Sequence, residues 1–138
     1  ADVAPGFDMP DYKRLIDRAN AAEMGVIVIR VLAAGALSGV AERDLVAAPS
    51  VAPIGSGRDY QQDFDRSAGF RFMVCEGYAD DLVEASVRFA LSNPGVSTVL
   101  VGYSNMDHLE QSVRFADKGP LPSDALDRLP QEWSQFVG

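Results

Sequence analysis

The sequence holds few of the residues on which covalent frameworks and metal centres depend. It has one cysteine, Cys75, and one histidine, His108, among 138 residues. One cysteine excludes an internal disulfide framework and a cysteine-based zinc site, and one histidine argues against a histidine-rich metal site. Scarce cysteine also suits a reducing compartment. We therefore expect a cytoplasmic protein without a bound metal.

Basic residues and long apolar runs are scarce as well. The chain has 12 Lys and Arg against 20 Asp and Glu, so its net charge is −8. Nucleic-acid binding needs clustered Lys and Arg, so we expect no nucleic-acid partner. The most apolar stretch, residues 24–41, is interrupted by Arg30 and three glycines. It falls short of the roughly 20 apolar residues of a membrane span. No signal-peptide pattern opens the sequence, and we expect no membrane segment.

The hydrophobic pattern that is present predicts an α/β fold with two parallel strands and about five helices. Residues 26–29 and 98–101 are apolar without alternation, which is typical of strands buried on both faces of a parallel sheet. Helical spacing appears over 11–23, 60–76, 82–92, 105–116 and from 123 onward. The expected capping residues are Asp11, Asp80 or Asp81, Asn105 and Ser123.

Finer expectations concern the helices and the loop between them. Gly69 should disturb the helix over 60–76, and Pro130 should kink or split the last helix. The core face of the helix over 82–92 is expected to hold Leu82, Ala85, Ser86, Phe89 and Ala90. Cys75 is expected on an apolar helix face, where a thiol is inert. Residues 40–58 form a long loop rich in proline and glycine, of a kind that is usually functional or mobile.

Two strands make a poor core, because each strand of a parallel sheet needs neighbours on both sides. We read residues 1–138 as one domain that is part of something larger, and the start at Ala1 instead of Met agrees with that expectation.

Two segments resemble the aldo-keto reductase family. Residues 25–39, GVIVIRVLAAGALSG, resemble the family's seventh strand and following loop. Residues 88–112, RFALSNPGVSTVLVGYSNMDHLEQS, resemble its seventh helix, eighth strand and the start of its eighth helix. The resemblance covers nearly the whole chain, more weakly in 40–80, and is nearest to the branch related to potassium-channel β subunits and sugar or aldehyde reductases. Since the family fold is an eight-stranded TIM barrel of about 250 residues, it implies the C-terminal part of such a barrel.

The resemblance also implies a function, the reduction of aldehydes or ketones by hydride transfer from NADPH. The family's catalytic Asp, Tyr, Lys and His lie on earlier strands, so it implies no catalytic residue here, and we expect the chain alone to be inactive. It does imply part of a cofactor site. The residues after strand seven, along the nicotinamide ribose and pyrophosphate, are Leu32, Ala33, Gly35 and Leu37. Those after strand eight, near the 2′-phosphate and adenine of NADP, are Gly102, Ser104, Asn105, His108, Gln111 and Ser112.

Several positions depart from the family pattern. Ile29 stands where an aromatic residue often stacks on the nicotinamide, and Arg30 stands where serine is usual. Arg30 could pair with the pyrophosphate or with a carboxylate elsewhere in the barrel. His108 replaces the usual Gln or Arg, and Gln111 and Ser112 replace the Glu and Asn that hold the adenine. Three basic residues of the middle region, either solvated or contacting the 2′-phosphate, are Arg43, Arg58 and Arg66.

Two other functions remain open from the sequence. The chain could be a non-catalytic nucleotide-binding or assembly module, or a truncated piece with no function of its own. In the first interpretation its partners are a small carbonyl substrate and either a second copy of the chain or the rest of the barrel, because open strand edges recruit other strands.

Overall fold

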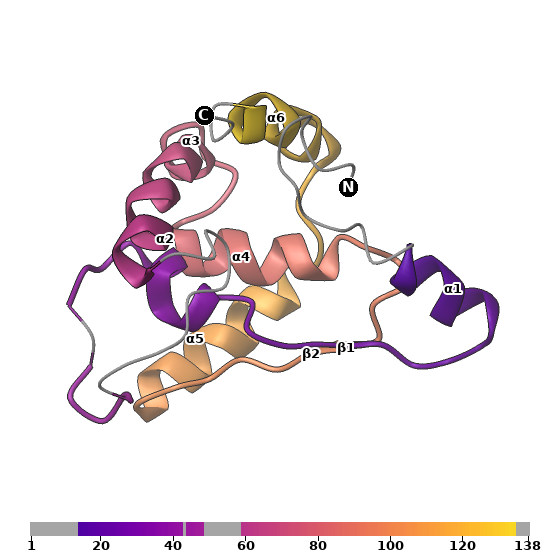
Figure 1. Ribbon diagram of the computed structural model, residues 1–138, viewed down its shortest axis with the longest axis horizontal. Coiled ribbons are helices and arrows are strands. Elements are labelled where there is room, and N and C mark those ends of the chain that lie inside the picture. Colours follow the sequence, from indigo (N-terminus) through magenta and orange to yellow (C-terminus); the bar gives the residue numbers. More distant parts are fainter. Residues whose placement is uncertain (1–13, 43, 49–58, 135–138) are drawn as a thin grey trace.

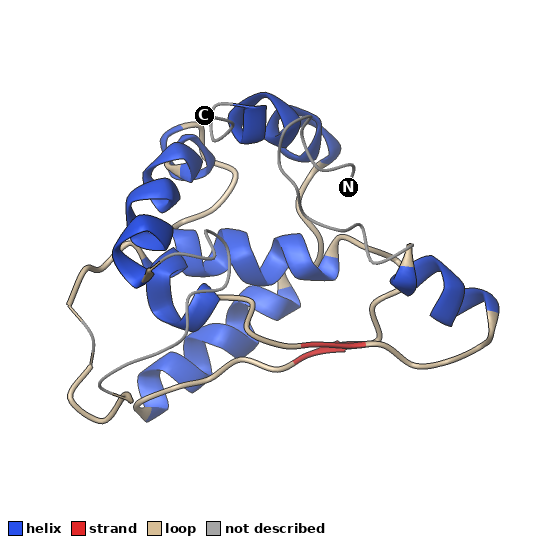
Figure 2. Cartoon of the chain, in the orientation of Figure 1, coloured by secondary structure: helices blue, strands red, loops and turns tan. Residues whose placement is uncertain are grey.

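The computed structural model describes residues 14–42, 44–48 and 59–134, and helices dominate them (Figures 1 and 2). The elements in chain order are α1 (Leu15–Ala21), β1 (Ile27–Val28), the 3-10 helix η1 (Ala33–Ser38), α2 (Tyr60–Ser67), the 3-10 turn η2 (Ala68–Phe70), α3 (Phe72–Cys75), α4 (Leu82–Leu91), β2 (Thr98–Val99), α5 (Met106–Asp117) and α6 (Ser123–Trp133). Within these ranges, every helix is too short or too polar to cross a membrane.

The two expected strands form and pair in parallel, which confirms the α/β class. Ile27 lies opposite Thr98 and Val28 opposite Val99. The strands are shorter than the apolar runs, although the backbone bonds continue past them. Val26 O accepts from the amides of Ser97 and Thr98 at 2.9 and 3.2 Å, and Val28 O accepts from Leu100 at 2.8 Å. Each strand has one partner in the described part of the chain, so each keeps an open edge.

Two of the expected helix caps are confirmed. Asp81 Oδ1 accepts from the Glu84 amide at 2.7 Å, and Asn105 Oδ1 accepts from the His108 amide at 2.9 Å. The expectation for Ser123 is wrong, because it is the first helical residue and follows Pro122, which offers no side-chain cap. Asp11 lies outside the described residues.

Gly69 interrupts its helix as expected, whereas Pro130 does not interrupt the last helix. The predicted helix over 60–76 is broken into α2, η2 and α3, with Gly69 inside the break, as predicted. Pro130, in contrast, lies inside an unbroken α6. Leu129 is 4% exposed and Trp133 packs on the core, and this packing on both sides of the proline holds the helix together.

Helix α4 lies at the centre of the molecule, with α3, α5, η1 and β2 packed against it (Figure 1). Its burial differs from the expected face. Phe89 is 41% exposed, whereas Glu84 and Val87 are each 1% exposed, because α5 covers a flank that the apolar stripe alone does not reveal. Cys75 is also exposed, contrary to expectation, at the end of α3. The main apolar cluster joins α3, α4 and α6 through Phe72, Met73, Ala79, Ala85, Leu121, Ala125 and Leu129.

A buried carboxylate ties α4 to the end of α5. Glu84 Oε1 is 2.8 Å from Arg88 Nη1, and Glu84 Oε2 is 2.7 Å from Lys118 Nζ. The same Oε2 accepts from the Asp80 amide at 3.1 Å. Burial raises the pKa of the Glu84 carboxyl, but the hydrogen bonds from Lys118, the Asp80 amide and Arg88 outweigh it, so the pKa lies below its ordinary value of 4.5. The charged form of Glu84 is therefore the stabilising one.

Replacing Glu84 by glutamine should lower the free energy of unfolding by about 3 kcal/mol, because two cations lose a buried counter-charge. The native pKa is depressed, so this stabilisation is present above the unfolded pKa near 4.5 and is lost as the pH falls through the native value. Urea titrations from about pH 7 to about pH 3 should show a weaker pH dependence in Glu84→Gln. Asp80→Asn is the control: the Asp80 carboxylate is 79% exposed, so its loss should change stability much less than the loss of Glu84 does. Equal losses in both variants would contradict this account.

Candidate functional site

The residues that the sequence marked as cofactor-binding follow the two strands at one edge of the sheet. Because β1 and β2 are parallel neighbours, their carboxyl ends lie together, and η1 follows β1 while α5 follows β2. Both lie on the same side of the strand pair, to the left in Figure 1. Open α/β sheets and α/β barrels bind ligands at the carboxyl ends of their strands. The fold therefore brings the two sets of residues to one candidate site.

The backbone amides of η1 are engaged in hydrogen bonds within the loop. The amide of Ala33 donates to Arg30 O at 2.8 Å, and those of Gly35 and Leu37 donate to Leu32 O at 2.8 and 3.1 Å. These amides are used within the loop and are not free for phosphate oxygens. Glycine suits position 35 because the backbone φ there is 105°, a value that residues with a side chain rarely adopt.

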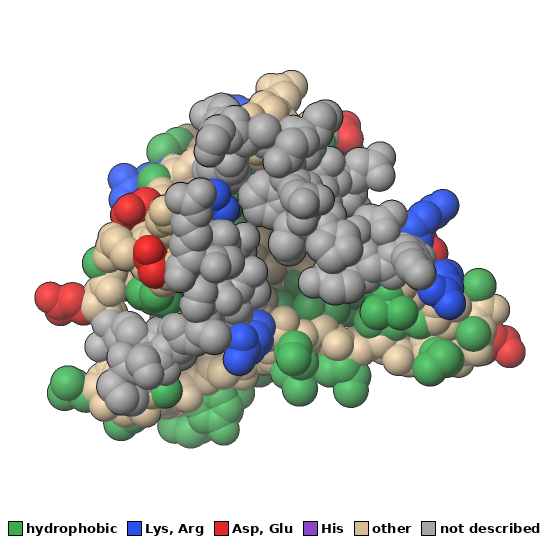
Figure 3. Space-filling view, viewed as in Figure 1, with side chains coloured by type: hydrophobic (Ala, Val, Ile, Leu, Met, Phe, Trp, Pro, Cys, Tyr) green, Lys and Arg blue, Asp and Glu red, His purple; other side chains and the backbone are tan. Residues whose placement is uncertain are grey.

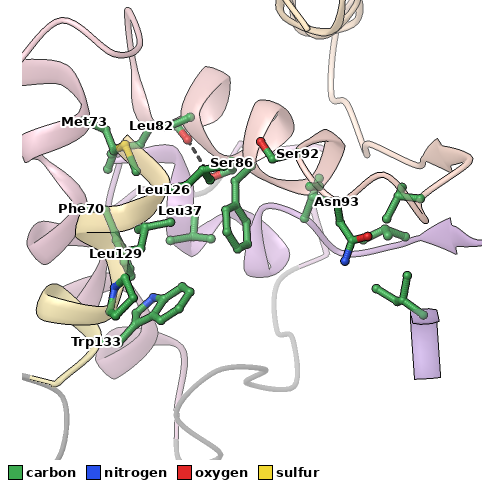
Figure 4. A pocket seen from close by; sticks show the side chains of 18 of the residues that line it. Leu37, Phe70, Met73, Leu82, Ser86, Ser92, Asn93, Leu126, Leu129 and Trp133 are labelled. Atoms are coloured by element: carbon green, nitrogen blue, oxygen red, sulfur yellow. Dashed lines mark hydrogen bonds between the residues drawn. The ribbon is translucent and has the colours of Figure 1, made fainter. Parts of the chain in front are cut away.

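The residues of this loop differ in how deeply they are buried. Leu32, Ala33 and Gly35 are half-buried, and Ala36 is fully buried. Leu37 points into an apolar cavity beside α4 and α6 (Figure 4). Leu37, which is also half-buried, therefore packs against this cavity.

The start of α5 forms the second half of the site. Asn105 caps the helix through the His108 amide, which leaves the amides of Met106 and Asp107 without an acceptor in the helix. The His108 ring Nε2 is 3.4 Å from Asn105 Nδ2, and Ser112 Oγ donates to His108 O at 2.8 Å. Ser104 and Gln111 are half-buried, and a Cβ on Gly102 would meet nothing within 4 Å. The space around position 102 would therefore admit a side chain.

Charges of both signs lie at this edge. Arg30 lies two residues after the end of β1, is exposed, and has a φ of 59°. Asp107 lies in the first turn of α5, where a carboxylate already faces the positive end of the helix dipole. Arg66 is half-buried in α2, and Arg43 and Arg58 lie outside the described residues. The described edge thus offers Arg30 as a cation for an anionic group.

A large apolar cavity is the feature that the sequence analysis missed. It has a volume of about 1130 Å³ and lies between α4, α6, η1 and α1 (Figure 4). Its walls include Leu82, Ala85, Ser86, Phe89 and Ala90, the residues expected to form the core face of α4. The apolar stripe of α4 was the one sequence feature that pointed to this cavity. Such a stripe does not show whether another element of the chain packs against it.

The two serine hydroxyls and the Asn93 side-chain oxygen in the cavity wall are satisfied within the chain, and the carboxylates of Asp17 and Asp127 line the cavity as well. Ser86 Oγ donates to Leu82 O at 2.7 Å, and Ser92 Oγ donates to Arg88 O at 2.7 Å and accepts from the Leu121 amide at 3.0 Å. Asn93 Oδ1 accepts from the Gly95 amide at 2.9 Å. Small-molecule sites keep a few convergent polar groups to orient the ligand. Apart from the two carboxylates, the wall consists mainly of apolar side chains.

Comparison with known proteins supports the family resemblance of the two strand-and-loop segments. The model of the aldo/keto reductase family matches residues 5–133. No curated protein matches the chain. The family is one of oxidoreductases that generally use NAD(P)H, and it implies a TIM barrel. Because the match spans nearly the whole sequence and includes both strands with their following loops, the chain belongs to the aldo/keto reductase family.

Proposed function

We propose that the chain is the C-terminal portion of an NADP-dependent oxidoreductase that reduces aldehydes or ketones, and that it supplies cofactor-binding loops without the catalytic residues. The observation that carries this proposal is the placement of η1 and the start of α5 after adjacent parallel strands, at one edge. Family membership supports the chemistry. The order of the matching segments, strand seven before strand eight, supports the C-terminal position.

The described residues fit a dinucleotide phosphate in a specific way. The free amides of Met106 and Asp107 and the capped start of α5 suit the 2′-phosphate. Arg30 suits the pyrophosphate by charge. NADPH, when bound, would supply the hydride. Leu32, Ala33 and Gly35 would give the cofactor a surface to lie on, since the amides of Ala33 and Gly35 are engaged within the loop.

The bare face of the strand pair supports association with further strands. Ile27, Ile29 and Leu100 are 60%, 61% and 57% exposed, whereas the alternate residues Val28 and Val99 are half-buried on the helix side. Figure 3 shows hydrophobic side chains gathered along this lower edge. In a TIM barrel such inward side chains meet those of the other strands. We therefore propose the remaining barrel strands, or failing those a second copy of the chain, as the partner.

Cysteine usage supports a cytoplasmic location for the parent protein. Cys75 is the single cysteine of the sequence, so a disulfide within the chain is impossible, and its thiol is exposed. Exposed free thiols persist in reducing compartments.

NADP should bind this chain more tightly than NAD, because the start of α5 favours the extra phosphate. Asn105→Asp should weaken NADP binding about two- to fivefold, since it places a negative charge beside the phosphate. Aspartate is as good a cap as asparagine, so the helix should persist. Calorimetric titrations with both dinucleotides measure the effect.

The matched control for this experiment is Asp107→Asn, which removes a charge from the same helix turn and should strengthen NADP binding. Equal affinities for NADP and NAD, or variants that bind NADP as the wild type does, would refute the assignment of the 2′-phosphate to this helix start.

The chain alone should not reduce carbonyl compounds. The family's catalytic residues lie on strands that precede its seventh, and the matched segments here are the seventh and eighth. Absorbance at 340 nm should stay constant when homogeneous protein is mixed with NADPH and 4-nitrobenzaldehyde or methylglyoxal. Steady NADPH oxidation would show that this chain carries its own catalytic groups.

The purified chain should sediment above 14.8 kDa at micromolar concentration. Burying a few hundred Å² of the bare face provides several kcal/mol at about 25 cal/mol per Å². Ile27→Lys and Leu100→Lys should each shift the protein toward the monomer. Val113→Lys, an equally exposed position at 55% on α5, should leave association unchanged. A wild-type monomer with a cooperative melt would rule out this surface as an interface.

A further inference from the structure

Arg88, near the end of α4, joins two turns of the chain to that helix. Its Nε donates to Gly119 O and its Nη2 to Pro120 O, both at 3.0 Å, in the turn between α5 and α6. Its Nη1 donates to Tyr78 O at 2.9 Å and pairs with Glu84 Oε1 at 2.8 Å. The side chain is 13% exposed, so water competes little for these bonds. A planar set of fixed donors therefore holds the turn after α5 against α4.

Two further contacts hold the same turn. Lys118 Nζ, at the end of α5, is 2.7 Å from Glu84 Oε2. The Leu121 amide donates to Ser92 Oγ at 3.0 Å. Because Glu84, Arg88 and Ser92 are four residues apart, they share one face of α4. The carboxyl end of α5 is thus clamped along this face.

The start of α5 has no such clamp in the described part of the chain. Asn105 Oδ1 accepts from the His108 amide, and Ser112 Oγ donates to His108 O, so these bonds stay within the helix. The bonds between the strands reach Leu100, whose amide donates to Val28 O at 2.8 Å. The direction of α5 is therefore set at its far end.

A helix of 12 residues carries a tilt from one end to the other. At about 1.5 Å per residue it is about 18 Å long, so a tilt of about 10° at the clamped turn displaces the first turn by about 3 Å. Hydrogen bonds to a bound phosphate tolerate much smaller displacements. The bonds of Arg88 therefore decide where the amides of Met106 and Asp107 point.

We propose that Arg88 is a positioning residue for the candidate cofactor site, and that it acts through the turn after α5. The inference rests on the proposed function, which assigns the 2′-phosphate of NADP to the start of α5. The hydrogen bonds of Arg88 go to Tyr78, Glu84, Gly119 and Pro120. None of these residues is assigned to the cofactor, so Arg88 acts on the dinucleotide through the helix and not by contact.

The first test needs no cofactor, because His108 is the single histidine of the sequence and lies in the first turn of α5. Arg88→Lys keeps the positive charge but loses the fork of donors. In NMR spectra of the folded variant, the ring signals of His108 should shift. Ser92→Ala removes a milder contact of the same turn and should shift them less, in the same direction.

The matched control is Arg128→Lys, which makes the same exchange in α6. Arg128 pairs with Glu76, and its Cζ lies 4.4 Å from the centroid of the Phe72 ring. This variant should leave the His108 signals where they are. Unchanged His108 signals in Arg88→Lys, or equal shifts in both arginine variants, would overturn the positioning role.

The second test separates positioning from a loss of folded protein. Arg88→Lys should weaken NADP binding about two- to fivefold, the range of a helix-terminus interaction, and leave NAD binding unchanged. A loss of folded protein would instead weaken both by the same factor, and that result would overturn the proposal. If the wild type binds NADP and NAD equally while Arg88→Lys still shifts His108, the assignment of the phosphate fails and the positioning of α5 by Arg88 stands.

Discussion

The guanidinium group of Arg88 holds the described part of the molecule together. It donates to the carbonyls of Tyr78, Gly119 and Pro120 at 2.9, 3.0 and 3.0 Å, and it pairs with Glu84 at 2.8 Å. These bonds fix the turn between α3 and α4 and the turn between α5 and α6 against the last turn of α4. The direction of α5 depends on them, and so does the position of its first turn at the candidate site. A planar group with several fixed donors is needed, and lysine could not replace it.

The sequence predicted those features that depend on neighbouring residues. The caps Asp81 and Asn105 need only a short polar side chain three residues before a free amide, and both form as predicted. The apolar runs around Ile27 and Val99 predicted a parallel pair correctly, since such runs are characteristic of that pairing. The family resemblance rested on these same segments and agrees with the family match.

Features that depend on distant segments were not predictable in the same way. The position of Phe89 at the cavity follows from where α6 and α1 lie, which the α4 sequence does not encode. The sequence placed Gly35 and Leu37 in a loop along the cofactor, but it did not reveal that the left-handed conformations of Ala33 and Ala34 turn this loop back onto Leu32 O. Glu84 was read as part of a helix, whereas its burial depends on Lys118, 34 residues away.

The pairing of β1 with β2 has a consequence for synthesis on the ribosome. Val26 and Ser97, which are hydrogen-bonded, lie 71 residues apart. At about 5–20 residues per second, β1 waits roughly 4 to 14 s after its synthesis before its partner is made. Until then both edges of the nascent β1 segment are open. Helices α2 to α4 are made in the meantime, so the helical layer covers the Val28 side of β1 before β2 pairs with it.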